Sequence, residues 1–222
     1  AERIAEDYDD ATATLVKTWS SVDPKSGSTK ETVRIFRDTS KGRQLLSTEK
    51  LLDGERLSLD HYEYFDENAA PAVRGLLKSR HLHDGSWERF AYDERGRLAR
   101  KWSPWKDSPV DSPDDRVVEE RYEYPALPLS SPYYDPFARF ARIDRLIEGV
   151  PVTTTYRIQG RDRNDGGRIK VEEQAARAGE DFGAPGARRT EARFFPVDEF
   201  EPSSGKIRSS VKPDGTLSTW SY

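Results

Sequence analysis

The sequence predicts an all-β fold, an antiparallel meander of repeated β-hairpins that forms one long, twisted or curled sheet. Three observations support this prediction. Aromatic or β-branched residues recur in pairs spaced by two, which places both members of a pair on one face of a strand. Asp-Gly dipeptides, which favour two-residue hairpin turns, recur along the chain. Hydrophobic residues make up only 34% of the 222 residues, too few for a large spherical core.

The paired positions define an internal repeat of about 30 residues. The second members of successive pairs lie 28 to 36 residues apart. About six repeats with two strands each predict roughly a dozen strands. The pairs are Val33/Ile35, Tyr62/Tyr64, Phe90/Tyr92, Tyr122/Tyr124, Tyr156/Ile158, Ala192/Phe194 and Trp220/Tyr222.

Residues 86–98 are the clearest copy of the repeat. After the pair Phe90/Tyr92, residues 93–96 (Asp-Glu-Arg-Gly) are typical of a type I turn that closes a bulged hairpin. In such a turn Asp93 accepts backbone N–H groups and Gly96 takes a positive φ. A return strand is expected from Arg97 onward. Return strands are likewise expected at Arg168-Ile169 and Lys206-Ile207, and two-residue turns at Asp53-Gly54, Asp84-Gly85, Glu148-Gly149 and Asp214-Gly215.

Four segments interrupt this pattern. Residues 1–12 are acidic, and we expect them to form a flexible N-terminal segment that precedes a single β-repeat domain over residues 13–222. Residues 103–116 contain three prolines and are expected to form a loop, as are residues 174–189, with a helical turn possible near 173–178. Residues 135–147 fit either a helix that begins at Asp135-Pro136 or, in the phase of the repeat, a turn and a strand.

The composition argues against several classes of protein. No stretch of 18 apolar residues is present, so we expect no membrane span. The 36 basic and 40 acidic residues give a net charge of −4 without a basic block, which argues against a nucleic-acid partner. The absence of Cys and the presence of only three His argue against a metal centre, a cofactor and nucleophilic catalysis. We therefore expect no enzymatic activity.

The candidate ligand-binding residues are aromatic. Trp102 and Trp105 flank a proline at an expected strand end, where indole rings can stack on a sugar or contact a partner protein. Tyr133 and Tyr134 are further candidates. No catalytic or metal-binding residue is expected, because His61, His81 and His83 lie on predicted strands.

Two acidic segments contain oxygen ligands of the kind found in calcium loops. Residues 162–167 begin like one but lack the late bidentate Glu, because Glu172 comes too early. The second is a cluster of aspartates in the proline-rich loop. We interpret both as turns. The clustered residues are Asp107, Asp111, Asp114 and Asp115.

The segment Tyr92-Asp93-Glu94-Arg95-Gly96-Arg97-Leu98 resembles the YD repeat of RHS (rearrangement hot spot) proteins, whose unit is Tyr-Asp, two variable residues and Gly-Arg-Leu. Residues 133–140 (Tyr-Tyr-Asp-Pro-Phe-Ala-Arg-Phe) are similar to a stretch near the end of RHS cores, with Ala138 in place of Gly. Asp144-Arg145 stands where the family has the Asp-Pro used for self-cleavage, so no autoproteolytic role carries over. The resemblance implies a bacterial β-hairpin sheet that is secreted or exposed on the cell surface.

We therefore expect a non-enzymatic module that acts in structure or in protein–protein interaction. The alternative is a binding module for carbohydrate or a cell-wall polymer that uses exposed Trp and Tyr side chains. The chain lacks an initiator Met, and we expect a secreted, periplasmic or surface protein whose signal peptide has been removed. The partner, protein or glycan, is not indicated by the sequence.

Overall fold

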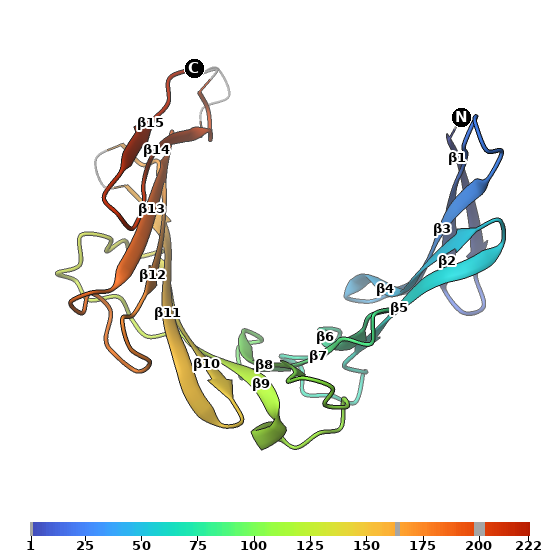
Figure 1. Ribbon diagram of the computed structural model, residues 1–222, viewed down its shortest axis with the longest axis horizontal. Helices are drawn as coiled ribbons and strands as arrows, with labels where there is room; N and C mark the ends of the chain where they lie inside the picture. The colour runs from blue at the N-terminus through green and yellow to red at the C-terminus, as the bar shows by residue number, and fades with distance from the viewer. Residues whose placement is uncertain (1, 163–164, 198–202) are drawn as a thin grey trace. The chain divides into compact units, whose positions relative to one another are not determined.

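The computed structural model describes residues 2–162, 165–197 and 203–222. It has the predicted all-β fold, an antiparallel meander whose strand order follows the chain from β1 to β15 (Figure 1). The one helical element among the described residues is a three-residue 3₁₀ helix, η1 (Asp114–Arg116). The described chain divides into two compact units, unit 1 up to Ser112 and unit 2 from Pro113 onward.

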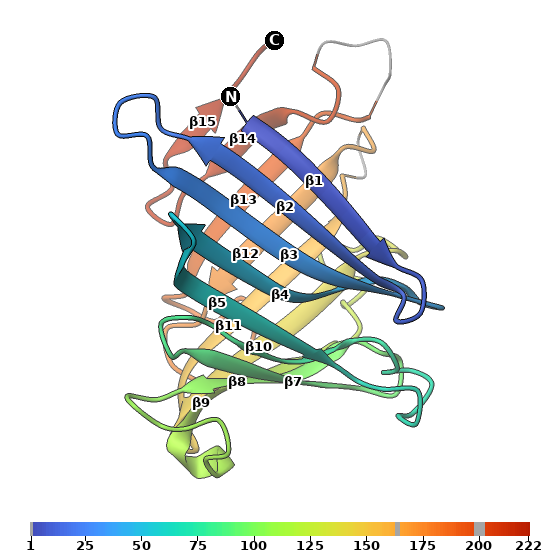
Figure 2. The ribbon, with the colours of Figure 1, turned by 90° about the vertical axis from the view of Figure 1, so that its right-hand side faces the viewer.

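Unit 1 contains eight strands, each paired with the next in antiparallel register. Figure 2 shows β1 to β5 as neighbouring strands of a single layer. The strands are β1 (Glu2–Asp9), β2 (Thr14–Val22), β3 (Thr29–Thr39), β4 (Gly42–Leu52), β5 (Glu55–Tyr64), β6 (Leu77–His81), β7 (Trp87–Tyr92) and β8 (Leu98–Pro104).

Unit 2 continues the same pattern with seven strands. Every pair from β9/β10 to β14/β15 is antiparallel. The strands are β9 (Val117–Glu123), β10 (Arg139–Ile147), β11 (Val150–Arg161), β12 (Arg168–Gln174), β13 (Arg188–Phe194), β14 (Ile207–Val211) and β15 (Leu217–Thr219).

The predicted repeat is present in the structure. Five of the seven predicted pairs lie within strands, namely β3, β5, β7, β11 and β13. In the other two, Tyr124 lies just after β9, and Trp220/Tyr222 lie after β15. The return strands predicted after the Gly turns are β8, β12 and β14. Two predicted two-residue turns have both central residues at positive φ, as a type I′ turn requires. They are Asp53-Gly54 and Glu148-Gly149.

Three segments differ from what the sequence suggested or left open. Glu2–Asp9 of the acidic segment, for which no strand was expected, form β1 and pair with β2. The region 135–147 is a turn followed by β10, so the strand alternative is correct for Arg139–Ile147. The helical turn considered near residues 173–178 is absent, because β12 extends to Gln174 and a loop without helix follows.

The core of unit 1 is thin. In β1 to β5 most side chains on both faces are exposed or half-buried, and Leu15 is one of few buried apolar residues. Tyr64 and Tyr92 donate their hydroxyl groups to the carbonyl oxygens of Leu45 and Leu77, and burial raises the pKa of both phenols. Aromatic side chains suit such a layer because their rings bury large areas while their hydroxyl groups find a backbone partner.

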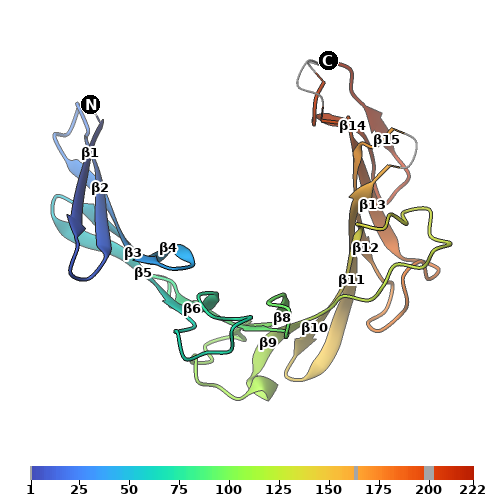
Figure 3. The ribbon, with the colours of Figure 1, turned by 180° about the vertical axis from the view of Figure 1, so that it is seen from behind.

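Unit 2 has a core because two loops cover one face of its sheet (Figure 3). Loop 124–138 supplies Leu127 and Tyr133, and loop 175–187 supplies Phe182. They pack against a central row of apolar residues from β11 and β12. This row consists of Ile158, Ile169 and Val171. We call this side of the sheet the covered face.

The Gly96 turn provides a test of the hairpin geometry. Gly96 has φ 74°, as predicted, and a Cβ atom at this position would lie 2.6 Å from the Ala72 carbonyl oxygen. We expect Gly96→Ala to lower the free energy of unfolding by more than the roughly 1–2 kcal/mol of the left-handed conformation alone. Gly85→Ala is the control, since Gly85 has φ 82° and open space around it. Urea denaturation of both variants checks this, and equal losses would contradict the close contact.

Asp93 makes the same turn sensitive to pH. Its carboxylate accepts the backbone N–H groups of Arg97 and Arg95 and the Arg97 side chain, and these bonds hold its pKa below the ordinary value. A lowered pKa in the folded state adds stability above the unfolded pKa, and this contribution disappears as the pH falls through the folded pKa.

We therefore expect the stability of the wild type to decline from about pH 5 downward. Asp93→Asn should decline less over this range, because the titrating carboxylate has been removed. Urea midpoints measured at a series of pH values check this, with Glu94→Gln as a control that should follow the wild type. Parallel curves for wild type and Asp93→Asn would contradict the role of Asp93.

Candidate functional site

The aromatic cluster of unit 2 fixes the two loops on the covered face. Phe140 stacks on Tyr156 with ring centroids 5.8 Å apart, and Phe182 meets both rings edge to face. Tyr133 adds a further edge contact with Phe182. The Arg189 guanidinium lies 4.9 Å above the Phe182 ring, a favourable position for a cation over an aromatic face.

Buried polar groups fix loop 175–187 in addition. The Glu173 carboxylate is fully buried and accepts hydrogen bonds from the Gly183 N–H and the Arg189 guanidinium. The Thr154 hydroxyl accepts the Gly179 N–H at 2.8 Å. Because a buried carboxylate without partners is very costly, these bonds make one position of the loop strongly preferred.

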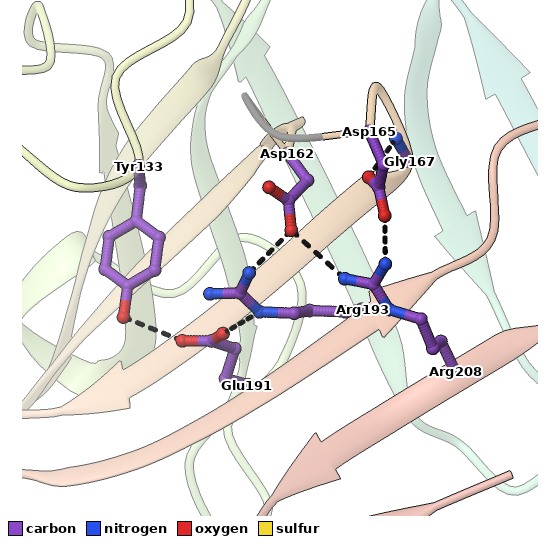
Figure 4. A network of polar contacts seen from close by, with 7 residues as sticks. All are labelled: Tyr133, Asp162, Asp165, Gly167, Glu191, Arg193 and Arg208. Atoms are coloured by element: carbon purple, nitrogen blue, oxygen red, sulfur yellow. Dashed lines mark hydrogen bonds and ion pairs between the residues drawn. The ribbon is translucent and has the colours of Figure 1, made fainter.

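A network of charges extends the covered face toward the β11–β12 turn (Figure 4). Arg193 donates to Glu191 at 2.6 Å and to Asp162 at 2.5 Å. Arg208 bonds to Asp162 at 3.2 Å and also to Asp165. Asp162 is only 4% exposed, so its charge depends on these two guanidinium groups.

The predicted residue Tyr133 belongs to this network. It is buried, and its hydroxyl group donates to Glu191 at 2.8 Å (Figure 4). Burial raises the pKa of the phenol, and the bond to the Glu191 carboxylate raises it further. Tyr133 therefore joins loop 124–138 to β13. Its neighbour Tyr134 lines a small open hollow of about 330 Å³ together with Asp135 and Arg161.

The predicted tryptophans lie in unit 1 and contact cations. The Arg89 guanidinium lies between the rings of Trp87 and Trp102, 5.3 Å from each centroid. Trp105 follows β8, and the Lys106 ammonium lies 5.7 Å from its ring. Both predicted tryptophans are half-buried. The structure therefore places Trp102 and Trp105 in one unit and Tyr133 and Tyr134 in the other.

The histidines and acidic loops form no cluster of three or more His, Cys, Asp or Glu side chains suited to a metal ion among the described residues. His61 and His81 face each other across β5 and β6, and His83 contacts Asp60 at 3.3 Å. In the first candidate calcium loop, Asp162 and Asp165 bind arginines, while Arg163 and Asn164 lie outside the described residues.

The opposite side of the unit 2 sheet, which we call the basic face, carries a concentration of cations that the sequence analysis missed. Over β11 to β14 and the start of β10, seven exposed basic residues lie there together with the acid Glu172. Farther along β10, Arg145 lies opposite Glu120 of β9, and Asp135 and Asp165 line a hollow of this face. Glu172 forms an ion pair with Arg157 at 2.9 Å. The other six cations form no ion pair with a described residue. The seven are Arg139, Arg157, Arg161, Arg168, Lys170, Arg188 and Lys212.

Two open hollows lie on the basic face. The larger, of about 760 Å³, is lined by Arg139, Arg161 and Arg168, by the acids Asp135 and Asp165, and by apolar residues that include Phe137 and Phe194. Arg168 and Lys170 lie over the Phe194 ring, at 4.4 and 5.7 Å from its centroid. The second hollow, of about 490 Å³, extends over β11 to β14. The basic face is the candidate functional site, because it combines free guanidinium groups with open concave surface.

Neither a family model nor a curated protein sequence matches this chain. Among the described residues, no helix has the length and apolar character that crossing a membrane would require.

The charge network predicts that two acid-to-amide substitutions lower the free energy of unfolding by different amounts. Asp162→Asn removes the buried carboxylate that Arg193 and Arg208 share, although each keeps a second acid, and we expect it to lower the free energy of unfolding by about 1–3 kcal/mol. Glu172→Gln is the matched control, since Arg157 and Glu172 are 53% and 55% exposed and such pairs contribute less than about 1 kcal/mol. Urea denaturation measures both. Similar losses would show that the network does not stabilise the fold.

Proposed function

We propose that this protein is a non-enzymatic module that acts by contact, through the open surface of its β-sheet. The observation that carries the proposal is the amount of surface. The chain exposes 14512 Å², whereas two compact globular units of half its mass would together expose about 12,400 Å². The excess comes from strands such as β1 to β5, which lack a covering layer on either side.

The edge strand β1 offers a second mode of contact. All eight of its residues are exposed, including Ile4 at 62%, and among the described residues it pairs only with β2. An exposed strand edge presents unpaired backbone donors and acceptors, to which an extended segment of a partner can bind. Both modes are typical of proteins that bind other macromolecules.

The alternative function, binding of carbohydrate or a cell-wall polymer, is favoured by the basic face. There, cations alternate with the hydroxyl and amide groups of Gln159, Thr190 and Ser210, which suit a ligand rich in hydroxyl groups. A secreted, periplasmic or surface location, and a relationship to RHS repeats, are part of the proposal and rest on composition and on the repeat at residues 92–98.

Binding assays that also monitor turnover test the proposal. We expect the full chain to bind members of a protein or glycan array while leaving peptides and glycans in solution unhydrolysed. The triple variant H61A/H81A/H83A should bind as the wild type does, because a contact surface needs no titrating base. Hydrolysis of any substrate that is lost in this triple variant would overturn the proposal, as would the absence of every binding partner on such arrays.

A further inference from the structure

The basic face stands out against the charge of the whole chain. The chain has a net charge of −4, yet among the described residues these seven cations have only Glu172, Asp135 and Asp165 on or beside the same face, a net charge of 7 − 3 = +4. On the covered face of the same strands, by contrast, arginines are paired with buried acids. Among the described residues, the basic side of the sheet therefore carries an excess of positive charge that the covered side does not.

The arrangement of the cations favours a linear polyanion. Same-face residues two apart on a strand, such as Arg168 and Lys170, are separated by about 6.6–6.8 Å, and adjacent strands by about 4.8 Å. Such spacings are within the Debye length of about 8 Å at physiological ionic strength, so the potentials of neighbouring cations add. The cations extend from β10 to β14, which exceeds the footprint of a single small anion.

The side chains between the cations indicate which polyanion fits. Guanidinium groups bind carboxylates through two parallel hydrogen bonds, and five of the seven cations are arginines. The same face also presents the polar side chains of Gln159, Thr190 and Ser210. Proteins that bind single-stranded nucleic acid offer a series of free aromatic rings on which bases stack. Here the Phe194 ring is covered by Arg168 and Lys170, and among the described residues that line the larger hollow Phe137, 81% exposed, is the one strongly exposed ring.

We propose that the basic face binds an acidic polysaccharide, a sugar chain that bears regularly spaced carboxylates. The guanidinium groups of Arg139, Arg161 and Arg168 pair with the carboxylates, and the neutral side chains between them bond to sugar hydroxyls. Phe137 packs against the apolar face of a sugar ring at the rim of the larger hollow. This inference rests on the proposed contact function and assigns it a ligand class and a surface.

The test compares two triple variants of the full chain that lose the same charge. R161A/K170A/K212A removes exposed cations without ion pairs from the basic face, and K25A/K78A/R95A removes three exposed cations from unit 1. Binding to immobilised polygalacturonate is measured at several salt concentrations, with neutral dextran and single-stranded oligothymidylate as further probes. Circular dichroism and urea midpoints establish that both variants fold as the wild type does.

We expect the wild type to bind polygalacturonate in a salt-dependent manner and dextran much more weakly. The basic-face variant should bind at least tenfold more weakly with a shallower salt dependence, and the unit 1 variant should change less than twofold. Equal weakening in both variants, tighter binding of oligothymidylate, or no binding of polygalacturonate would overturn the inference. If polygalacturonate does not bind but other partners do, the ligand assignment is wrong and the proposed contact function still holds. Hydrolysis that depends on the histidines would instead contradict the contact function itself.

Discussion

The alternation of side chains along each strand is the constraint on which the rest of this structure depends. A meander of short hairpins produces a sheet, and each strand sends every second side chain to the opposite face. Because a sheet has two faces, each apolar side chain needs cover from neighbouring strands or from loops. Unit 1 relies mainly on neighbouring strands, and unit 2 adds loops. The low apolar content of the chain follows from this arrangement, since a single layer cannot bury more.

In unit 1 the cover comes from long polar side chains. Cross-strand neighbours in β1 to β5 combine apolar residues with Lys, Arg, Glu and Thr, whose aliphatic stems pack along the sheet while their charged ends stay in water. Trp19 under the Arg34 guanidinium, at 5.1 Å, shows this packing. Pairs such as Lys17 with Glu6 add little energy individually but also protect the sheet from pairing with other sheets.

In unit 2, polar contacts hold the two loops on the sheet, and without these contacts the loops would detach from it. Tyr133 of loop 124–138 bonds to Glu191 on β13, and Gly183 of loop 175–187 bonds to the buried Glu173 on β12. Glu173 lies beside Arg189 of the neighbouring strand β13, and Glu191 lies beside Arg193 of its own strand. Displacing a loop would therefore expose aromatic surface and also remove partners from buried charges, so the two loops and the covered face form one cooperative structure.

The hairpins were predictable from the sequence because their signals are local. Pairs such as Phe90/Tyr92 and turns such as Asp53-Gly54 lie within a few residues of the contacts that they specify. The strand β1 was missed because its acidic residues suggested a flexible segment, although Ile4 and Tyr8 share a face at a strand period. The loop contacts were not predictable, because Tyr133 and Glu191 lie 58 residues apart and no local pattern connects them.

The basic face shows the same limit and explains why charge counting along the chain fails for a sheet. Its cations occur singly or in pairs in the sequence, and each strand also carries acids or apolar residues that point the other way. On β12, Arg168 and Lys170 alternate with the buried Ile169 and Val171. Taking every second residue of each strand reveals the basic side chains that share one face of that strand. Only the antiparallel register shows that these basic faces of neighbouring strands lie on the same side of the sheet. Brought together in this way, uncompensated like charges repel one another and lower the stability of the folded sheet. Most of the acids of these strands lie on the covered face, where Glu173 and Glu191 hold the loops. Fold stability alone would favour a mixed charge distribution, and this difference is the physical basis of the proposal that an anionic ligand binds here.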